Sequence, residues 1–351
     1  CNAGKSLNEG DHNIFLGCYA GESATSAACN IFLGTKAGCS LTSGCQNIFL
    51  GKDSNRCRTS GNNNISLGHF SAMRAESGSY NISIGLGARL SATGGSDSVA
   101  IGRYAQRYVT GNCNIAIGMC AGTGASGGAS GTFNVAIGRY AGELFTTGKG
   151  NVLLGKNAGR ALTTGCSNLA LGCYAMNSGV VTGDNNISLG KVSLQNLTSG
   201  ADNIAIGQCA LGAGVVTGTH NIAIGCKTAK GITSGESNIF IGRGAGINET
   251  ITGQRNLVIG HYAATNITSG SYNLILGQSS GRNITSGTHN VAIGAYTPSA
   301  TDNCQLVIGL SVANKYWITG NSDFNVGIGT TTIHSRLTVA GDACVSGVIT
   351  A

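Results

Sequence analysis

The chain has 351 residues, of which 58 are glycine and one is proline, while 10% are charged and 5% are aromatic. This composition is unlike that of an enzyme, and it excludes collagen, because glycine does not recur at every third residue and proline is almost absent. The net charge of +7 is spread without a dense basic run, and no stretch of about 18 apolar residues occurs. We therefore expect neither a nucleic-acid partner nor insertion into a membrane.

After a predicted entry or cap over residues 1–12, apolar residues recur in a tandem repeat that spans residues 13–298. Seventeen blocks of the form Asn-aliphatic-x-aliphatic-Gly follow one another at steps of 16 to 20 residues, most of them 17, and Ser98 alone replaces the leading Asn. Numbered from that Asn, the consensus is N-I-x-I-G-x-x-A-G-x-x-x-T-S-G-x-x. No unit of this length buries a core alone, so the repeat predicts an all-β fold, a parallel β-solenoid (β-roll) of about seventeen 17-residue coils.

The repeat positions predict how each coil is built. Positions 2 and 4 are always Ile, Leu or Val, which places two aliphatic side chains on one face of a short strand, and position 8 is small. We therefore expect positions 2, 4 and 8 to form the core. Positions 1, 5 and 15 are the predicted corners, because glycine permits positive φ or a close approach to the next coil. The leading Asn predicts a ladder of side chains that hydrogen-bond to the adjacent coil.

Position 3 is expected to point outward from the strand, and none of its seventeen residues is charged. An uncharged stripe on an outer surface predicts a covered interface between copies of the chain. Three chains around an axis is the favoured arrangement, although a dimer or a filament lattice would satisfy the same stripe. The predicted interface residues are Phe15, Phe32, Phe49, Ala100, Ala116, Ala136, Leu153, Phe240, Val258 and Ile275.

Positions 6 and 7 carry the strongest signal for ligand binding, because basic residues recur at position 6 and aromatic residues at position 7. Tyrosine faces stack on sugar rings and neighbouring cations attract anionic glycans, which favours a cell-surface polysaccharide as the ligand. The competing interpretation is that the tyrosines shield the coil edge or pack between subunits while the cations keep it soluble. The candidate residues are Lys52, Phe70, Arg103, Tyr104, Arg139, Tyr140, Tyr174, Arg243, Tyr262 and Tyr296.

The sequence gathers no acid, base and nucleophile into a catalytic pattern, and its histidines lie far apart, so we expect no enzyme activity, no metal site and no cofactor. The 14 cysteines include no CxxC pair. Disulfides of Cys29 with Cys45 and of Cys39 with Cys57 would bridge adjacent coils in an extracellular setting, and free thiols are the open alternative. Three Asn-x-Thr sequons recur at one loop position and are N-glycosylation sites only in a host that glycosylates. They begin at Asn196, Asn266 and Asn283.

Two further segments follow the repeat. Pro298 falls where the last unit loses its Ser/Thr-Gly turn, and it is interpreted as the end of the solenoid. Residues 299–324 are then expected to form an irregular final coil or transition. Residues 325–351 are expected to form a separate C-terminal module.

The block from Ser98 to Gly102 and the block from Asn134 to Gly138 resemble the β-roll head repeats of trimeric autotransporter adhesins and the repeats of bacteriophage and large-virus fibre proteins. The segment 325–342 is similar to the short module that precedes an intramolecular chaperone in phage tail fibres. Such a chaperone assembles the trimer and is then cut off. The chain ends at Ala351 without one, which fits either removal or an incomplete sequence.

This resemblance implies a structural or adhesive fibre, a viral or phage tail or receptor-binding fibre at the virion surface or outside the cell. Its partners would be further copies of the chain and a cell-surface glycan. The alternative is a subunit of an extracellular filament or a bacterial surface adhesin with a purely structural role. An ice-binding solenoid is disfavoured, because the Ser and Thr residues lie singly in turns rather than in a paired array on one strand face.

Overall fold

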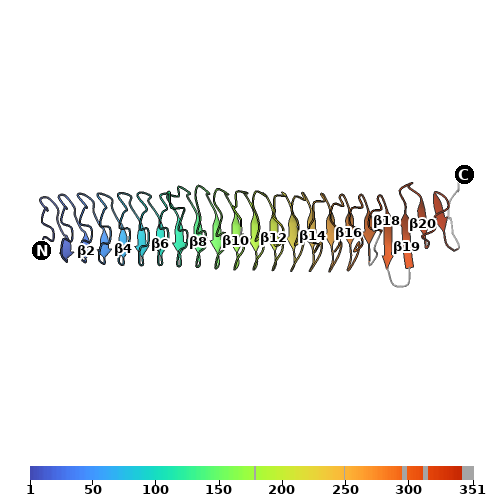
Figure 1. The fold of residues 1–351 in the computed structure, drawn as a ribbon, viewed down its shortest axis with the longest axis horizontal. Helices are drawn as coiled ribbons and strands as arrows, with labels where there is room; N and C mark the ends of the chain where they lie inside the picture. The colour runs from blue at the N-terminus through green and yellow to red at the C-terminus, as the bar shows by residue number, and fades with distance from the viewer. Residues whose placement is uncertain (178, 249, 295–298, 311–314, 342–351) are drawn as a thin grey trace. The chain divides into compact units, whose positions relative to one another are not determined.

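The computed structural model describes residues 1–177, 179–248, 250–294, 299–310 and 315–341. Within them the chain is all-β and contains no helix, and it forms a parallel β-solenoid of about seventeen coils. Each of the first seventeen strands is three residues long and occupies repeat positions 2 to 4. Within each unit the strands of successive coils lie side by side and pair in register (Figure 1). Phe15, Phe32 and Phe49 are therefore direct neighbours in successive strands. The predicted fold class is confirmed at this level.

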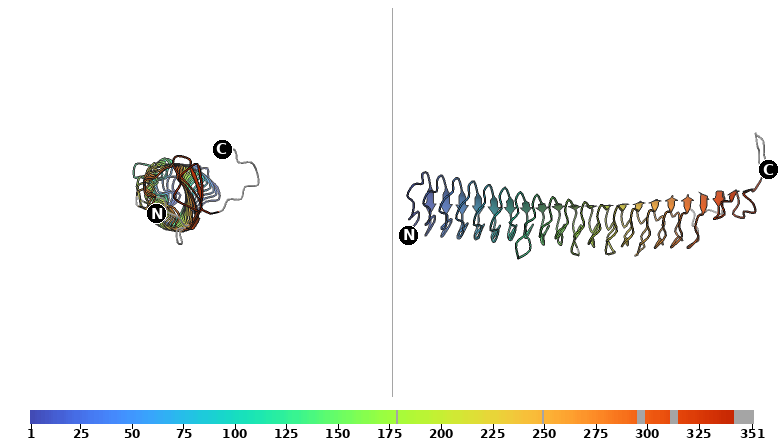
Figure 2. Two further views of the ribbon diagram at one scale, coloured as in Figure 1. Left: turned by 90° about the vertical axis from the view of Figure 1, so that its right-hand side faces the viewer. Right: turned by 90° about the horizontal axis from the view of Figure 1, so that it is seen from above.

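The chain divides into two compact units, Cys1–Ser199 and Gly200–Ala351. In each unit the short parallel strands lie along one side of the coils (Figure 2). The strands of the first unit are β1 (Ile14–Leu16), β2 (Ile31–Leu33), β3 (Ile48–Leu50), β4 (Ile65–Leu67), β5 (Ile82–Ile84), β6 (Val99–Ile101), β7 (Ile115–Ile117), β8 (Val135–Ile137), β9 (Val152–Leu154), β10 (Leu169–Leu171) and β11 (Ile187–Leu189). Those of the second unit are β12 (Ile204–Ile206), β13 (Ile222–Ile224), β14 (Ile239–Ile241), β15 (Leu257–Ile259), β16 (Leu274–Leu276), β17 (Val291–Ile293), β18 (Leu306–Leu310), β19 (Lys315–Gly320), β20 (Val326–Ile328) and β21 (Leu337–Val339).

The strands face the opposite way from the prediction. Position 3 points into the coil and is buried, whereas positions 2 and 4 point outward and are partly or fully exposed. The predicted interface residues therefore belong to the chain's own core, where a second copy cannot reach them. Those with a buried side chain are Phe32, Phe49, Ala100, Ala116, Ala136, Leu153, Phe240, Val258 and Ile275, and Phe15 packs partly buried against the same core.

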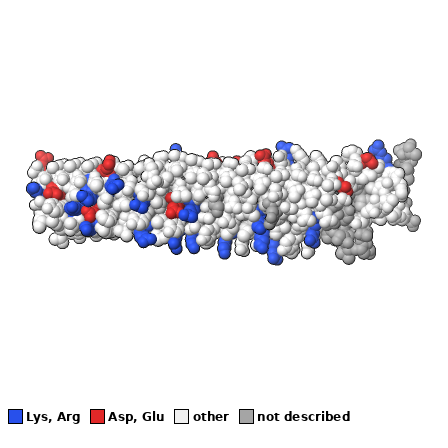
Figure 3. Space-filling model, in the orientation of Figure 1, with Lys and Arg blue, Asp and Glu red and all other residues white. Residues whose placement is uncertain are grey.

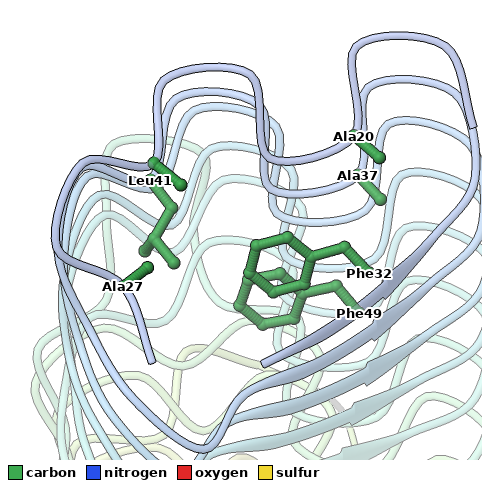
Figure 4. Close-up of a cluster of buried hydrophobic side chains, with 7 residues drawn as sticks. Ala20, Ala27, Phe32, Ala37, Leu41 and Phe49 are labelled. Carbon is green, nitrogen blue, oxygen red and sulfur yellow. The ribbon is translucent and has the colours of Figure 1, made fainter. Parts of the chain in front are cut away.

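Side chains at positions 3, 8, 9 and 12 fill the interior. The row at position 8 is buried as predicted, and the row at position 12 is buried as well. In the first coils Phe32 stacks on Phe49 with ring centroids 4.6 Å apart, while Ala37 and Leu41 close the opposite wall (Figure 4). The coil is narrow, so the side chains at position 3 of the strand contact those at positions 8 and 12 from the rest of the coil.

Position 9 complements position 3 in volume. Where position 3 is large, position 9 is usually glycine, because a Cβ at Gly38 would lie 2.8 Å from the ring of Phe32 and one at Gly246 would lie 2.4 Å from the ring of Phe240. In several coils where position 3 is small, position 9 supplies the bulk, as Met176, Leu194 and Leu211 do beside Ala170, Ser188 and Ala205. In these coils the interior volume is conserved by a pair of positions rather than by a single one.

The leading Asn residues form the predicted ladder. The amide Nδ2 of Asn47 donates to Oδ1 of Asn30 at 3.0 Å and to the carbonyl oxygen of Gly61 at 2.9 Å, and the backbone N–H of Asn47 also donates to Asn30 Oδ1. The first bond joins neighbouring coils, and the second closes a coil from position 1 to position 15. Ser98 interrupts the amide ladder, and there the backbone N–H of Asn114 donates to the Ser98 hydroxyl at 3.2 Å.

The corners combine close backbone approach with left-handed conformations. A Cβ at Gly34, at position 5, would lie 2.6 Å from the carbonyl oxygen of Gly51 in the next coil, so only glycine fits this corner. Positions 7 and 17 also adopt positive φ, although side chains as large as Tyr140 (φ 58°) and Tyr272 (φ 59°) occupy them. The left-handed turn at position 7 was not predicted, and it decides how the tyrosine row is presented.

The interior of coils 3 to 6 is polar. Arg58 is 1% exposed and Arg89 is fully buried, and among the described residues no carboxylate forms an ion pair with either. Arg58 donates to Asn55 Oδ1 and to the carbonyl oxygen of Gly78, while Arg89 donates to Gln106 Oε1. Burial lowers the pKa of Arg58 to about 9 and that of Arg89 to about 10.

Both ends of the chain are more regular than predicted. Residues 1–12 already follow the coil path, with the N–H of Gly4 donating to the carbonyl oxygen of Ala20 and with Leu7 packed against the core. The described residues of the segment 299–324 include β18, which continues the parallel stack on β17, and β19, which pairs antiparallel with both β18 and β20. β20 then pairs parallel with β21, while Pro298 lies outside the described residues.

Candidate ligand-binding edge

One edge of the coil, which we call the 6–7–10 edge after its repeat positions, gathers most of the predicted binding residues of the first unit. The backbone builds it, because each N–H at position 7 donates to the carbonyl oxygen at position 6 of the preceding coil. Asn157 donates in this way to Arg139, and Tyr174 donates to Lys156, both at 2.9 Å. With position 7 fixed in a left-handed turn, successive side chains are displayed at the same place on every coil.

Cations lie over the tyrosine rings of this edge. Arg139 stands 4.9 Å from the ring centroid of Tyr140, with Arg160 at 5.8 Å from the same ring, and Lys156 stands 5.5 Å from that of Tyr174. The predicted neighbours Arg103 and Tyr104 also make this contact, at 5.8 Å, as do Arg243 and Tyr262 at 5.8 Å. Such contacts orient the rings and hold positive charge next to them.

A surface cleft of about 300 Å³ opens on this edge over coils 8 to 10. It brings together three predicted residues, Arg139, Tyr140 and Tyr174. The remaining lining residues were not predicted as a site and are Glu143, Lys156, Asn157 and Arg160. Glu143 and Arg160 occupy position 10, and their alternating charges at matching places in successive units were the signal that could have revealed them.

Two features give the cleft its polarity. Arg160 Nε donates to Glu143 Oε2 at 2.6 Å, so the one carboxylate of the cleft is paired. Asn157 is 8% exposed, and its Oδ1 is buried without a hydrogen-bond partner in the described structure. A buried unpaired acceptor is costly, and this one has no surface open to the cleft.

A second cleft, of about 370 Å³, lies on the same edge near the start of the chain. It is lined by Tyr19, Glu22, Lys36, Cys39 and Arg56. It contains one tyrosine, and none of its five lining residues has a buried polar side-chain atom without a partner. The two clefts share a position in the repeat and differ in chemistry.

The other predicted binding residues are spread along the chain. Lys52 is exposed, and Phe70 stacks on its neighbour His69 with ring centroids 3.7 Å apart. Tyr296 lies outside the described residues. A pair that the sequence interpretation missed, Arg255 over Tyr272 at 5.3 Å, lies at position 17 rather than at positions 6 and 7. On the face shown in Figure 3, basic groups recur along one edge of a mostly uncharged surface.

The predicted disulfides are absent, and all four cysteines are free thiols. The parallel register explains why. It pairs Cys45 with Ala28 rather than with Cys29, and the N–H of Ser40 with the carbonyl oxygen of Arg56, so each predicted pair is one residue out of step. Burial raises the pKa of the Cys39 thiol above its ordinary value.

The sequons differ in exposure. Asn266 and Asn283 are exposed, whereas Asn196 is partly buried, so their use as glycosylation sites stays a prediction. Across the described ranges, no cluster of three or more His, Cys, Asp or Glu side chains is placed to hold a metal ion. The same residues include no helix that is long and apolar enough to cross a membrane.

Comparisons with protein-family models, with curated proteins and with solved structures gave no match to this chain.

Proposed function

We propose that the protein is a structural and adhesive fibre subunit, part of a viral or phage attachment fibre, which self-associates and holds on to cell-surface glycans. The observation that carries the proposal is the outward face of the parallel strands. In the first unit both outward positions of all eleven strands are Ile, Leu or Val. A continuous row of partly exposed aliphatic side chains of this kind is typical of a surface that associates with a partner.

The exposure of these rows supports a role in assembly. Within β7, Ile115 is 37% exposed and Ile117 is 36% exposed, whereas Ala116 between them is 1% exposed. The interior is already filled by positions 3, 8 and 12, so the outward rows contribute little to the core of a single chain. Association of copies through this face would remove them from water, at roughly 25 cal/mol for each Å² buried.

A homotrimer is the favoured assembly, because one flat face per chain closes around a three-fold axis and leaves the 6–7–10 edge open to solvent. Such a fibre belongs at the virion surface or outside the cell, and the chain needs no catalytic group or cofactor for this role. The alternative is a subunit of an extracellular filament or a bacterial surface adhesin, in which the same apolar rows join chains into an open-ended lattice.

Mass measurement of the native full-length chain, with negative-stain imaging, tests the proposal. We expect discrete three-chain particles, and we expect the double variant Ile115→Lys/Ile117→Lys to remain as single chains with unchanged β-type circular dichroism, because a charge cannot be buried unpaired in the interface. Ser126→Lys, an exposed change in the same coil, is the matched control and should assemble normally.

The outcomes separate the two forms of the proposal. Open-ended filaments in place of three-chain particles would support the filament alternative. A wild-type chain that stays monomeric, or a double variant that assembles as well as wild type, would overturn association through the outward rows.

A further inference from the structure

We infer that the cleft over coils 8 to 10 is a binding subsite for an acidic sugar, a saccharide unit that carries a carboxylate or sulfate group. The inference rests on the proposed attachment to glycans and names both the place and the ligand class. Three features of the cleft carry it: its net charge, its tyrosine rings and its gap in the tyrosine row.

The charge of the cleft favours an anion. Its lining contains three cations, Arg139, Lys156 and Arg160, and one carboxylate, Glu143, which gives a net charge of +2. The Arg160 guanidinium is already held by Glu143 at 2.6 Å. Arg139 and Lys156 are exposed and form no ion pair among the described residues, so they are the groups left for a carboxylate or sulfate.

The shape of the cleft follows from one substitution in the repeat. Position 7 is Tyr140 in coil 8, Asn157 in coil 9 and Tyr174 in coil 10, so the middle ring of a three-coil row is missing. The two tyrosines are two coil steps apart, which is roughly 9.6 Å at ~4.8 Å per step. The space left by the missing ring is suited to a sugar ring lying against the remaining tyrosines.

Tyr174 is the better stacking partner of the two. Two guanidinium groups, of Arg139 and Arg160, lie over the Tyr140 ring, whereas one ammonium group, of Lys156, lies over the Tyr174 ring at 5.5 Å. A flexible lysine on an exposed stem moves aside more readily than a guanidinium held by a carboxylate.

The tyrosine rings distinguish a sugar from a simple anion. Inorganic sulfate suits the cations but brings no ring face for Tyr140 and Tyr174. An acidic sugar brings both an anionic group for Arg139 and Lys156 and a ring face for the tyrosines.

The test uses the full-length chain and calorimetric titration with four probes: a polygalacturonate oligosaccharide, a heparin-derived oligosaccharide, a neutral dextran oligosaccharide and single-stranded DNA. We expect at least one acidic oligosaccharide to bind at least tenfold more tightly than the dextran. Asn157→Tyr should abolish this binding, because it completes the tyrosine row and fills the cleft. The repeat already accepts tyrosine in this left-handed turn in both neighbouring coils, so this variant should fold.

Two further variants sharpen the result. Tyr174→Ala should weaken binding of the acidic oligosaccharide at least tenfold, through loss of the stacking ring. Tyr19→Ala is the matched control, since it removes the tyrosine of the other cleft on the same edge and should leave the affinity unchanged.

The failures are distinguishable. If the acidic oligosaccharide still binds to both Asn157→Tyr and Tyr174→Ala, this site is wrong, although attachment to glycans stands. Equal affinity for dextran and the acidic oligosaccharides would overturn only the acidic class of ligand. DNA that binds as tightly as the oligosaccharides, and is lost in Asn157→Tyr, would overturn the ligand class. A wild-type chain that binds no saccharide would overturn both this inference and the proposed glycan attachment, without touching self-association.

Discussion

The two sides of each strand are chemically similar and have opposite surroundings. In β2, Phe32 on the inner side is fully buried, while Ile31 and Leu33 on the outer side keep part of their surface in solvent. The difference does not follow from hydrophobicity, because aliphatic residues are more regular on the outer side than on the inner one. It follows from coil width, since a coil of about 17 residues has room for one row from its strand and fills the rest from positions 8, 9 and 12.

The inner row tolerates variation that the outer rows do not show. Position 3 ranges from Ala and Ser to Phe, and in several coils position 9 changes volume in the opposite sense. Positions 2 and 4 hold only Ile, Leu or Val, although the chain itself leaves them only partly buried or exposed. The inner face is therefore matched within a chain, whereas the outer face is uniform in the way that a surface for identical partners would be.

The strongest test of this difference is to replace, in separate variants, one inward and one outward side chain of the same strand by alanine. In the Ile115→Lys/Ile117→Lys background, where association does not contribute, we expect Phe32→Ala to lower the free energy of unfolding by about 3–5 kcal/mol. Leu33→Ala, on the outer side of the same strand, should cost under about 1 kcal/mol there. Urea denaturation measures both, and losses of similar size would show that the two sides do not differ as described.

The Asn ladder gives the next largest effect, because it stabilises the corner beside the inner face. Asn47→Ala removes the amide that donates to Asn30 Oδ1 and to the Gly61 carbonyl oxygen, leaving buried groups unpaired. We expect a loss of about 2–3 kcal/mol in the same denaturation experiment. Ser98→Asn, which restores an amide where the ladder is interrupted, should cause no such loss, and an unchanged stability in Asn47→Ala would refute the ladder's role.

The smallest change in the free energy of unfolding at neutral pH is expected from replacing a buried arginine. Its effect should become visible only as the pH is raised. Burial lowers the pKa of Arg89 in the folded chain to about 10, below its ordinary value in the unfolded chain. The unfolded chain therefore holds this proton more tightly, and stability should rise with pH above about 10 until the unfolded arginine also titrates. Arg89→Met should lose this rise while changing stability little at pH 7, because removal of the buried charge offsets the loss of the hydrogen bond to Gln106 Oε1.

Urea denaturation of the wild-type chain and of Arg89→Met at pH 8, 10 and 11 measures the free energy of unfolding of each. Taking the difference between the two proteins removes the contribution of Lys, Tyr and Cys titration, which they share. A difference that does not change with pH would mean that Arg89 stays equally protonated in the folded and unfolded chains.

Much of the fold was predictable from local pattern. The seventeen blocks indicated the number of coils, glycine at position 5 indicated a corner, and the repeated Asn indicated a ladder, because each is a property of one coil and its in-register neighbour. The disulfides were wrong for a related reason. A pairing of Cys29 with Cys45 ignores that these cysteines occupy positions 17 and 16 of successive units, and the observed pairing of Cys45 with Ala28 follows that offset.

The repeat thus determined by itself that the chain is a solenoid with an aliphatic face, a small-residue wall and an edge of tyrosines and cations. Only the tertiary structure decided which side of each strand faces inward, because alternation along a strand separates position 3 from positions 2 and 4 without saying which side the coil closes over. It likewise decided that Tyr140, Asn157 and Tyr174 share one cleft, since that depends on the left-handed turn at position 7 and on stacking across three coils.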